Sequence, residues 1–350
     1  MKFDVIIGNP PYQLETGGDD RPPSSARAIY HLFVDKAIEL NPKYITMIIP
    51  SRWMGGNAGG VPIDWIDKMV NDTRIKEIHD FIDSKDCFTN VKIRGGVNYF
   101  LWDKYYSEKC SFYQHSEGKE IKFNKDYLNT KNSGVIVRDV NALSIVDKVV
   151  EVEGDYLEKE EQNFSSMVSP TGYFISGAIS SKLGGSWKGF SMKEDEEHTV
   201  KYYTSKFLNG TDVGWGKRSD ILRNVDTKDL HKVLLSASGE NEKFGKVITE
   251  PRYSEPNSIA SGTYLIIGYD NKKHNFTKEE CYNIISYIRT KFFRFMVDVK
   301  KASQHCARGV YQFVPLQDWS KPWTDEELYK KYKLTQEEID YIENNIKPMS

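Results

Sequence analysis

The first dozen residues place the strongest constraint on how this chain can fold. The apolar run at residues 5–7 ends at Gly8, and the tetrapeptide Asn-Pro-Pro-Tyr at residues 9–12, the NPPY loop, follows directly. A short apolar run that stops at a glycine is typical of a strand inside a sheet. Each proline fixes its own φ and restricts the residue before it, which leaves the loop few conformations. The sequence therefore predicts a sheet with a rigid polar loop beyond the carboxyl end of one strand.

The pattern after this loop alternates between strand and helix. Apolar positions at helical spacing predict a helix over residues 27–40, capped by Ser24 or Ser25, and a second helix over 62–70. Buried strands are predicted at 44–50, 75–82, 96–103 and 110–115. This order favours an α/β domain with a parallel sheet covered by helices, and the last strands indicate an antiparallel finish.

The texture changes in the second part of the chain. Short strands and turns punctuated by glycine and aromatic residues predict a separate mixed α+β domain, with a boundary at about 115–140. The 350 residues leave room for two domains. A single long helix is predicted over 277–299, with a capping box at Thr277 and Glu280. Two further capping boxes predict short helices after Thr324 and Thr335.

The NPPY loop offers a specific chemistry. The exocyclic amine of adenine is a weak nucleophile, and two fixed hydrogen-bond acceptors assist it. The side-chain oxygen of Asn9 and the carbonyl of Pro10 provide them, and Pro10 and Pro11 hold both in place. The ring of Tyr12 can stack on a base that has been flipped out of a duplex. The competing interpretation is an ordinary proline-rich turn after a strand.

The segment FDVIIGNPPY resembles the catalytic motif of adenine-N6 DNA methyltransferases, and in particular the gamma-type enzymes of type II restriction-modification systems. The stretches IYHLFVDKAIELNPKYITMIIPSRW and KDCFTNVKIRGGVNYFLWDK resemble the elements that follow this motif in the family. The resemblance implies a partial Rossmann-like sheet, S-adenosylmethionine as methyl donor and double-stranded DNA as substrate. It also implies that Phe88 packs on the second face of the flipped adenine, with an ordinary core aromatic as the alternative.

The glycine-rich cofactor loop of that family precedes the catalytic motif, and nothing precedes it here. Residues 54–60 (MGGNAGG) and 181–191 (SKLGGSWKGFS) contain glycines but lack the strand–turn–helix context, so we interpret both as ordinary loops. We therefore expect residues 1–125 to be the later half of a catalytic domain. We expect residues 126–350 to be a target-recognition domain with C-terminal helices. The cofactor half would be a separate upstream polypeptide or be lost, and the strand at 5–7 would have one unpaired edge.

Basic residues interleave with aromatic ones in the second domain, although the net charge of the chain is only −2. Such residues can contact phosphates and bases. For each one alone, a solvated surface charge is the alternative. The candidates for DNA contact are Lys217, Arg218, Arg223, Lys246, Arg252, Arg289 and Arg294.

The remaining features narrow the class of protein. The four cysteines are widely spaced, so we expect reduced thiols, no metal site and a cytoplasmic location. No convincing nuclease site is present, and we expect any associated restriction activity to lie in a missing N-terminal region or in a partner subunit. Three hypotheses remain: a site-specific DNA adenine methyltransferase of a restriction-modification system, a DNA-binding specificity module without activity of its own, and an RNA or protein amine methyltransferase.

Overall fold

The computed structural model describes most of the chain in two compact units, Met1–Ser144 and Ile145–Ser350, which are treated separately below. The described residues are 3–14, 27–56, 59–89, 91, 93, 95–116, 118–125, 128–174, 191–208, 211–221, 223–238, 245, 247–270, 272–301 and 306–349.

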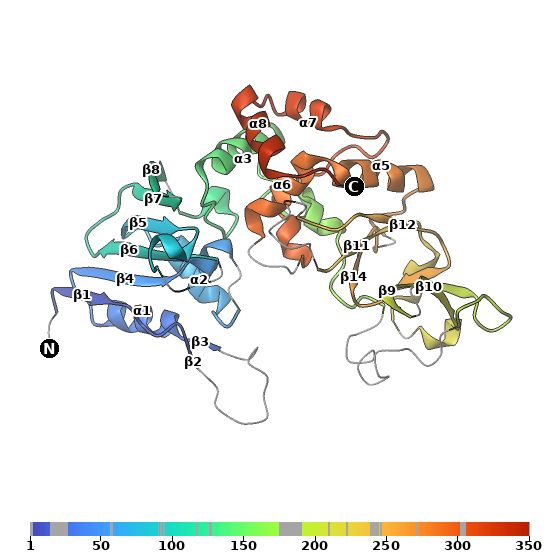
Figure 1. Cartoon of the computed structure of the whole chain (residues 1–350), viewed down its shortest axis with the longest axis horizontal. Helices are drawn as coiled ribbons and strands as arrows, with labels where there is room; N and C mark the ends of the chain where they lie inside the picture. The colour runs from blue at the N-terminus through green and yellow to red at the C-terminus, as the bar shows by residue number, and fades with distance from the viewer. Residues whose placement is uncertain are drawn as a thin grey trace. The chain divides into compact units, whose positions relative to one another are not determined.

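The first unit is built on a mixed six-stranded sheet with the order β1-β4-β6-β5-β7-β8 (Figure 1). Its strands are β1 (Val5–Gly8), β4 (Tyr44–Pro50), β5 (Ile75–Phe81), β6 (Val97–Asp103), β7 (Cys110–Ser116) and β8 (Lys119–Lys125). The β1–β4 and β5–β7 pairs are parallel, and β6 lies antiparallel between β4 and β5. The predicted α/β class is confirmed. Antiparallel pairing already begins with β6, whereas the sequence suggested it only for the last strands.

Two helices cover one face of this sheet, α1 (Tyr30–Glu39) and α2 (Ile63–Val70). Their buried residues join those of the sheet in one hydrophobic core, which includes Val34, Trp65, Ile45, Phe100 and Trp102. On the opposite face, side chains such as Ile48 and Tyr99 are only partly buried.

The start of α1 differs from the prediction. Arg27–Ala28 form a short strand, β3, which pairs with β2 (Gln13–Leu14), and the helix begins only at Tyr30. Ile29 occupies the N-cap position and makes no side-chain cap, because its hydrocarbon side chain offers no acceptor. Its backbone N–H donates to the carbonyl of Tyr12 at 3.1 Å. The predicted caps Ser24 and Ser25 lie outside the described residues.

A buried ionic network joins three strands near the carboxyl ends of β4 and β5. Asp80 is fully buried, and its carboxylate accepts hydrogen bonds from Ser51 Oγ at 2.6 Å and from Arg138 Nε and Nη2 at 2.6 and 2.7 Å. Arg138 also donates to the carbonyl of Gly95 at 2.9 Å. Asn98 on β6 donates to the carbonyl of Ile49 at 3.2 Å. The network fixes where these strands end.

The second unit contains two three-stranded sheets. One has the order β10-β9-β13, with β9 (Val200–Leu208), β10 (Thr211–Gly216) and β13 (Ser258–Ala260). The other has the order β12-β11-β14, with β11 (Lys232–Ser236), β12 (Arg252–Ser254) and β14 (Tyr264–Ile267). The ammonium group of Lys232 is buried at the start of β11 and donates to the carbonyls of Lys228 and Leu230 at 3.1 and 2.9 Å.

The helices of this unit match the sequence pattern except at one position. The predicted helix at 277–299 is two helices, α5 (Lys278–Arg289) and α6 (Lys291–Lys300). Thr290 separates them because its ψ is 149° and its side chain accepts a hydrogen bond from the N–H of Phe293, which starts a new helix. The capping boxes at Thr277, Thr324 and Thr335 are all confirmed.

The other helices are α3 (Val140–Glu153), α7 (Asp325–Lys331) and α8 (Gln336–Asn345). Short 3-10 helices fill several connections: Ser51–Gly55, Ser84–Asp86, Thr130–Asn132, Glu160–Gln162, Phe164–Met167, Arg218–Asp220, Val225–Asp229 and Arg308–Tyr311. Among the helices that the structure describes, none has the length and apolar character needed to cross a membrane.

Replacing Asp80 by Asn should lower the free energy of unfolding by about 3 kcal/mol, because the guanidinium of Arg138 loses its buried counter-ion. The matched control is Asp35→Asn, which removes only the exposed pair with Lys68 and should change stability by less than ~1 kcal/mol. Urea denaturation of the purified variants measures both. Equal effects would mean that the Asp80 network is not a central support of the unit.

Candidate functional site

The NPPY loop leaves the sheet at the edge where the parallel strands end. The register of β1 on β4 runs from Val5↔Tyr44 to Gly8↔Met47, so Asn9 lies just beyond the paired segment. Among the described strands β1 has β4 as its only neighbour, as expected from the sequence. Ile6 packs on the core, whereas Val5 and Ile7 point to the opposite face of the sheet and are 48% and 77% exposed. The loop is therefore carried by the outermost strand, at the edge where open α/β sheets bind ligands.

The loop is held at both of its ends. On one side β1 pairs with β4, and on the other the carbonyl of Tyr12 accepts from Ile29 before the β2–β3 pair begins. Pro10 is buried between these anchors, whereas Asn9 and Pro11 are exposed. The amide side chain of Asn9 is thus accessible on a backbone with little freedom, which is what a preorganised acceptor requires.

The ring of Tyr12 packs against the hydrophobic core of the first unit and is half-buried. Burial, with a smaller contribution from Cys87, raises the pKa of Tyr12 to about 12. Its hydroxyl is buried and has no hydrogen-bond partner among the residues that the structure describes. The phenol therefore stays neutral at physiological pH, and packing of the ring is its principal interaction.

The segment that carries Phe88 approaches Tyr12. A short helix, Ser84–Asp86, turns the chain after β5, and the N–H of Phe88 donates to the carbonyl of Ser84 at 2.7 Å. Cys87, the preceding residue, lies close enough to Tyr12 to influence its pKa. Phe88 itself is half-buried and lies outside the buried core. Phe88 is therefore partly accessible and directly follows a residue close to Tyr12, and its role in base stacking stays a prediction.

The glycines at residues 54–60 have a structural explanation. Gly56 has φ +75°, and a Cβ there would lie 3.1 Å from the carbonyl oxygen of Gly134. Gly60 has φ +86°, and a Cβ would lie 2.9 Å from the backbone nitrogen of Ala28. Both positions need glycine because the chain packs closely against itself. Residues 57 and 58, and 181–190 of the second glycine-rich segment, lie outside the described residues.

The structure separates the predicted DNA contacts into different environments. Lys217, Arg252 and Arg289 form ion pairs with Glu197, Asp212 and Glu250 respectively. Arg218 and Arg223 are exposed, with no side-chain ion pair among the described residues. Lys246 lies outside the described residues.

Arg294 does not fit the prediction of a DNA contact. It is only 1% exposed, and its guanidinium donates to the carbonyls of Thr290, Arg289 and Lys347 at 3.2, 3.2 and 2.5 Å. These carbonyls occupy the donors that a phosphate would need. We therefore withdraw Arg294 from the proposed DNA contacts. Its position on the apolar stripe of the helix was the available signal of burial.

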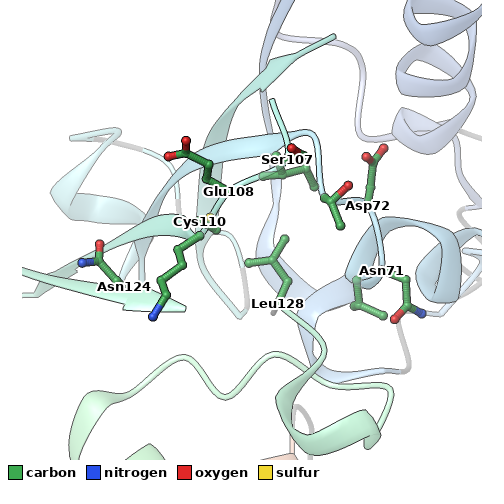
Figure 2. Close-up of a pocket in the computed structure, with 11 residues that line it drawn as sticks. Asn71, Asp72, Ser107, Glu108, Cys110, Asn124 and Leu128 are labelled. Carbon is green, nitrogen blue, oxygen red and sulfur yellow. The ribbon is translucent and has the colours of Figure 1, made fainter. Parts of the chain in front are cut away.

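A cavity of about 850 Å³ lies at the other end of the strands, where β5 and β7 begin (Figure 2). Asn71, Asp72, Glu108, Cys110 and Leu128 are among its lining residues. The carboxylate of Asp72 is already engaged, since Arg74 Nε donates to it at 2.8 Å and Trp102 Nε1 at 3.1 Å. The cavity is thus separated by the length of the strands from the NPPY loop.

Arg52 was missed by the sequence prediction. It follows β4 at the same edge as the NPPY loop, and its Nε is buried with no hydrogen-bond partner in the described part of the chain. Gly95, at φ +88°, makes room for it, since a Cβ there would lie 2.6 Å from Arg52 Cγ. The sequence signal was an arginine two positions after Pro50, the last residue of a buried strand.

The first part of the chain is similar to a known protein family. The family model of the Eco57I restriction-modification methylases matches residues 1–88, which include the NPPY loop, Arg52 and Phe88. The resemblance predicted from the motif is confirmed over these residues.

An uncharacterized adenine-specific methylase of Mycoplasma pneumoniae (strain ATCC 29342 / M129 / Subtype 1) is 52% identical over 133 residues. The matched region is 37% of this chain and 31% of the relative, so the chain spans about a third of that protein.

Similar solved structures include two restriction enzymes. The type IIL restriction-modification enzyme MmeI in complex with DNA gives a TM-score of 0.40 at 11% identity, covering 99% of this chain and 55% of that one. The type IIG restriction endonuclease BpuSI gives 0.36 at 11% identity, covering 95% and 49%.

Tyr12→Phe should leave the free energy of unfolding unchanged within ~0.5 kcal/mol or raise it, because it removes a buried hydroxyl that makes no hydrogen bond. Tyr12→Ala should lower it by about 2–4 kcal/mol, because the ring packs on the core. Thermal and urea unfolding distinguish the two. A large loss in Tyr12→Phe would reveal a hydrogen bond to that hydroxyl and contradict this description.

Proposed function

We propose that this chain is the catalytic and target-recognition part of a DNA adenine-N6 methyltransferase of a restriction-modification system. The observation that carries the proposal is the exposed Asn9 on a loop held at both ends, with Tyr12 three positions further along the same loop. The match of residues 1–88 to a restriction-modification methylase family and the adenine-specific methylase relative support it.

The proposed mechanism follows from the acceptors of the loop. An adenine flipped out of the duplex places its amine against the side-chain oxygen of Asn9 and the carbonyl of Pro10. Both acceptors favour a nitrogen whose lone pair is free to attack. When bound, S-adenosylmethionine would supply an electrophilic methyl group on its sulfonium, with S-adenosylhomocysteine as the leaving group and one amine proton lost to solvent. Tyr12 and Phe88 hold the base by stacking on its faces. Pro11 keeps the loop in its conformation.

A second polypeptide segment is proposed to complete the site. The unpaired edge of β1 exposes Val5 and Ile7, and the outer side of α1 exposes Leu32, Phe33 and Leu40. A free parallel edge beside an apolar helix face is a surface that proteins normally cover. A further strand and helix would cover it, and the segment that supplies them would bring the cofactor loop. The second unit would then supply the DNA contacts, with Arg218 and Arg223 as its accessible cations.

A specificity module without activity of its own is the alternative within the same class. It requires DNA binding without methyl transfer under any reconstitution. An RNA or protein amine methyltransferase with the same loop is the third possibility. A panel of substrates with labelled S-adenosylmethionine separates these hypotheses, because only the first transfers label to DNA.

Asn9→Ala should reduce methyl transfer to DNA by at least ~100-fold in the reconstituted enzyme, because one preorganised acceptor is lost. Since Asn9 is exposed and at the end of a strand, folding and DNA affinity should stay unchanged. Labelled-methyl transfer and a DNA-binding titration measure the two properties. Turnover close to that of the wild type would remove Asn9 from catalysis.

The chain by itself should bind S-adenosylmethionine only weakly, because Gly56 and Gly60 serve packing within the chain. Isothermal titration with the cofactor tests this. Micromolar binding by the monomer would show that a cofactor site is present in these 350 residues and that the β1 edge needs no further segment.

DNA affinity of the full chain should fall steeply with salt, because phosphate contacts release counter-ions. The Arg218→Ala/Arg223→Ala double variant should lower the salt slope by about 1–2, whereas Arg294→Lys, a change at a buried position, should leave the slope unaltered. Fluorescence anisotropy between 50 and 200 mM salt, roughly the range over which such contacts weaken, provides the measurement. An unchanged slope in the double variant would place the DNA interface elsewhere.

A further inference from the structure

Three potential metal ligands converge on the half-exposed face of the first unit's sheet. They are His79 on β5, His115 on β7 and Glu120 on β8, and their ligand atoms all lie within 4.8 Å of one another. His79 Nδ1 is 3.0 Å from His115 Nε2, and His115 Nε2 is 3.5 Å from Glu120 Oε2. No pattern in the sequence joined these residues, because sheet pairing brings them together.

The strand register explains why the three side chains share one face. β5 and β7 are parallel with Phe81↔His115 in register, and His79 precedes Phe81 by two positions. β7 and β8 are antiparallel with His115↔Glu120 directly opposite each other. Residues two apart on a strand, and residues paired across strands, point to the same side of a sheet.

Aromatic neighbours hold both imidazoles in orientation. The ring of His79 is stacked between Tyr99 and Tyr113, with centroids 4.5 and 4.1 Å away and interplanar angles of 10° and 5°. The ring of His115 stacks on Phe81 at 4.3 Å and 10°. Fixed rings reduce the conformational entropy lost when a metal binds. The third group, Glu120, is 51% exposed and free to adjust its position.

We propose that His79, His115 and Glu120 bind a divalent first-row transition ion, with Zn²⁺ preferred. In a tetrahedral zinc site with bonds of about 2.0–2.1 Å, the ligand atoms lie about 3.3 Å apart, close to the 3.0 and 3.5 Å found here. Without metal, the two imidazoles share a proton in a hydrogen bond, and a small rotation of the rings opens the pair for the ion. Three protein ligands leave a fourth position for water.

The ion would cross-link the strands β5, β7 and β8 on one side of the sheet. Among the described strands β8 pairs only with β7, and a bond from Glu120 to the metal would link it through His115 to His79 on β5. The site is independent of methyl transfer, because its residues are separate from the NPPY loop. Failure of one proposal would therefore leave the other untouched.

The test is titration of the metal-free full chain with Zn²⁺, and with Co²⁺ as a spectroscopic probe. We expect one ion per chain, with a Kd on the order of micromolar or tighter. Cobalt should give the intense visible absorption of a tetrahedral site. Saturating zinc should raise the melting temperature by at least ~4 °C.

Variants identify the ligands. Glu120→Gln and His115→Gln should each weaken zinc binding at least ~10-fold, and circular dichroism verifies that they fold. The matched control is His198→Gln, at a surface histidine that pairs with Asp195 at 2.9 Å, and it should bind zinc like the wild type. Cys87→Ser excludes binding at the half-buried thiol. Absence of saturable binding, or binding unchanged in Glu120→Gln and His115→Gln, would overturn the proposal and leave the histidines as a hydrogen-bonded pair.

Discussion

The buried carboxylate of Asp80 is the interaction on which the end of the first unit's sheet near the NPPY loop depends. It accepts three hydrogen bonds, from Ser51 after β4 and from Arg138, and Arg138 in turn holds the carbonyl of Gly95 before β6. Three elements therefore end at a fixed place. The NPPY loop leaves β1 beside the end of β4. The pairing of β1 with β4 therefore links the position of the loop to this network.

Two properties of the outer strand β1 bear on the proposed function. It carries the loop that we propose to be catalytic, and it leaves one edge and the apolar side chains Val5 and Ile7 exposed. A strand paired on one side is a weak platform for precise chemistry. We propose that a further segment on this edge supplies the methyl donor beside a loop that is already held in place, and that the second unit contacts the DNA.

Local sequence patterns predicted many of the helices and strands. The features that they missed depend on contacts between residues far apart in the sequence or on the local backbone. The strands near residues 44–50 and 96–103 and all three capping boxes followed from short-range rules. The break at Thr290 did not, because the apolar stripe continues through it and only the local backbone turns. Asp80 and Arg138 are 58 positions apart, and no sequence pattern links them. The burial of Arg294 likewise depends on carbonyls distant in sequence, including that of Lys347.

The most direct test of the proposed function is a comparison of genomic DNA methylation in cells that carry the natural gene and in cells with Asn9→Ala at the chromosomal locus. Every natural partner is present in this experiment, so a separate cofactor-binding segment is not a confounding factor. Mass spectrometry of nucleosides and single-molecule sequencing measure N6-methyladenine and its sequence context. We predict that one methylated adenine motif disappears in the variant while the others persist. An identical methylation pattern in the two strains would contradict the assignment of the NPPY loop to adenine methylation.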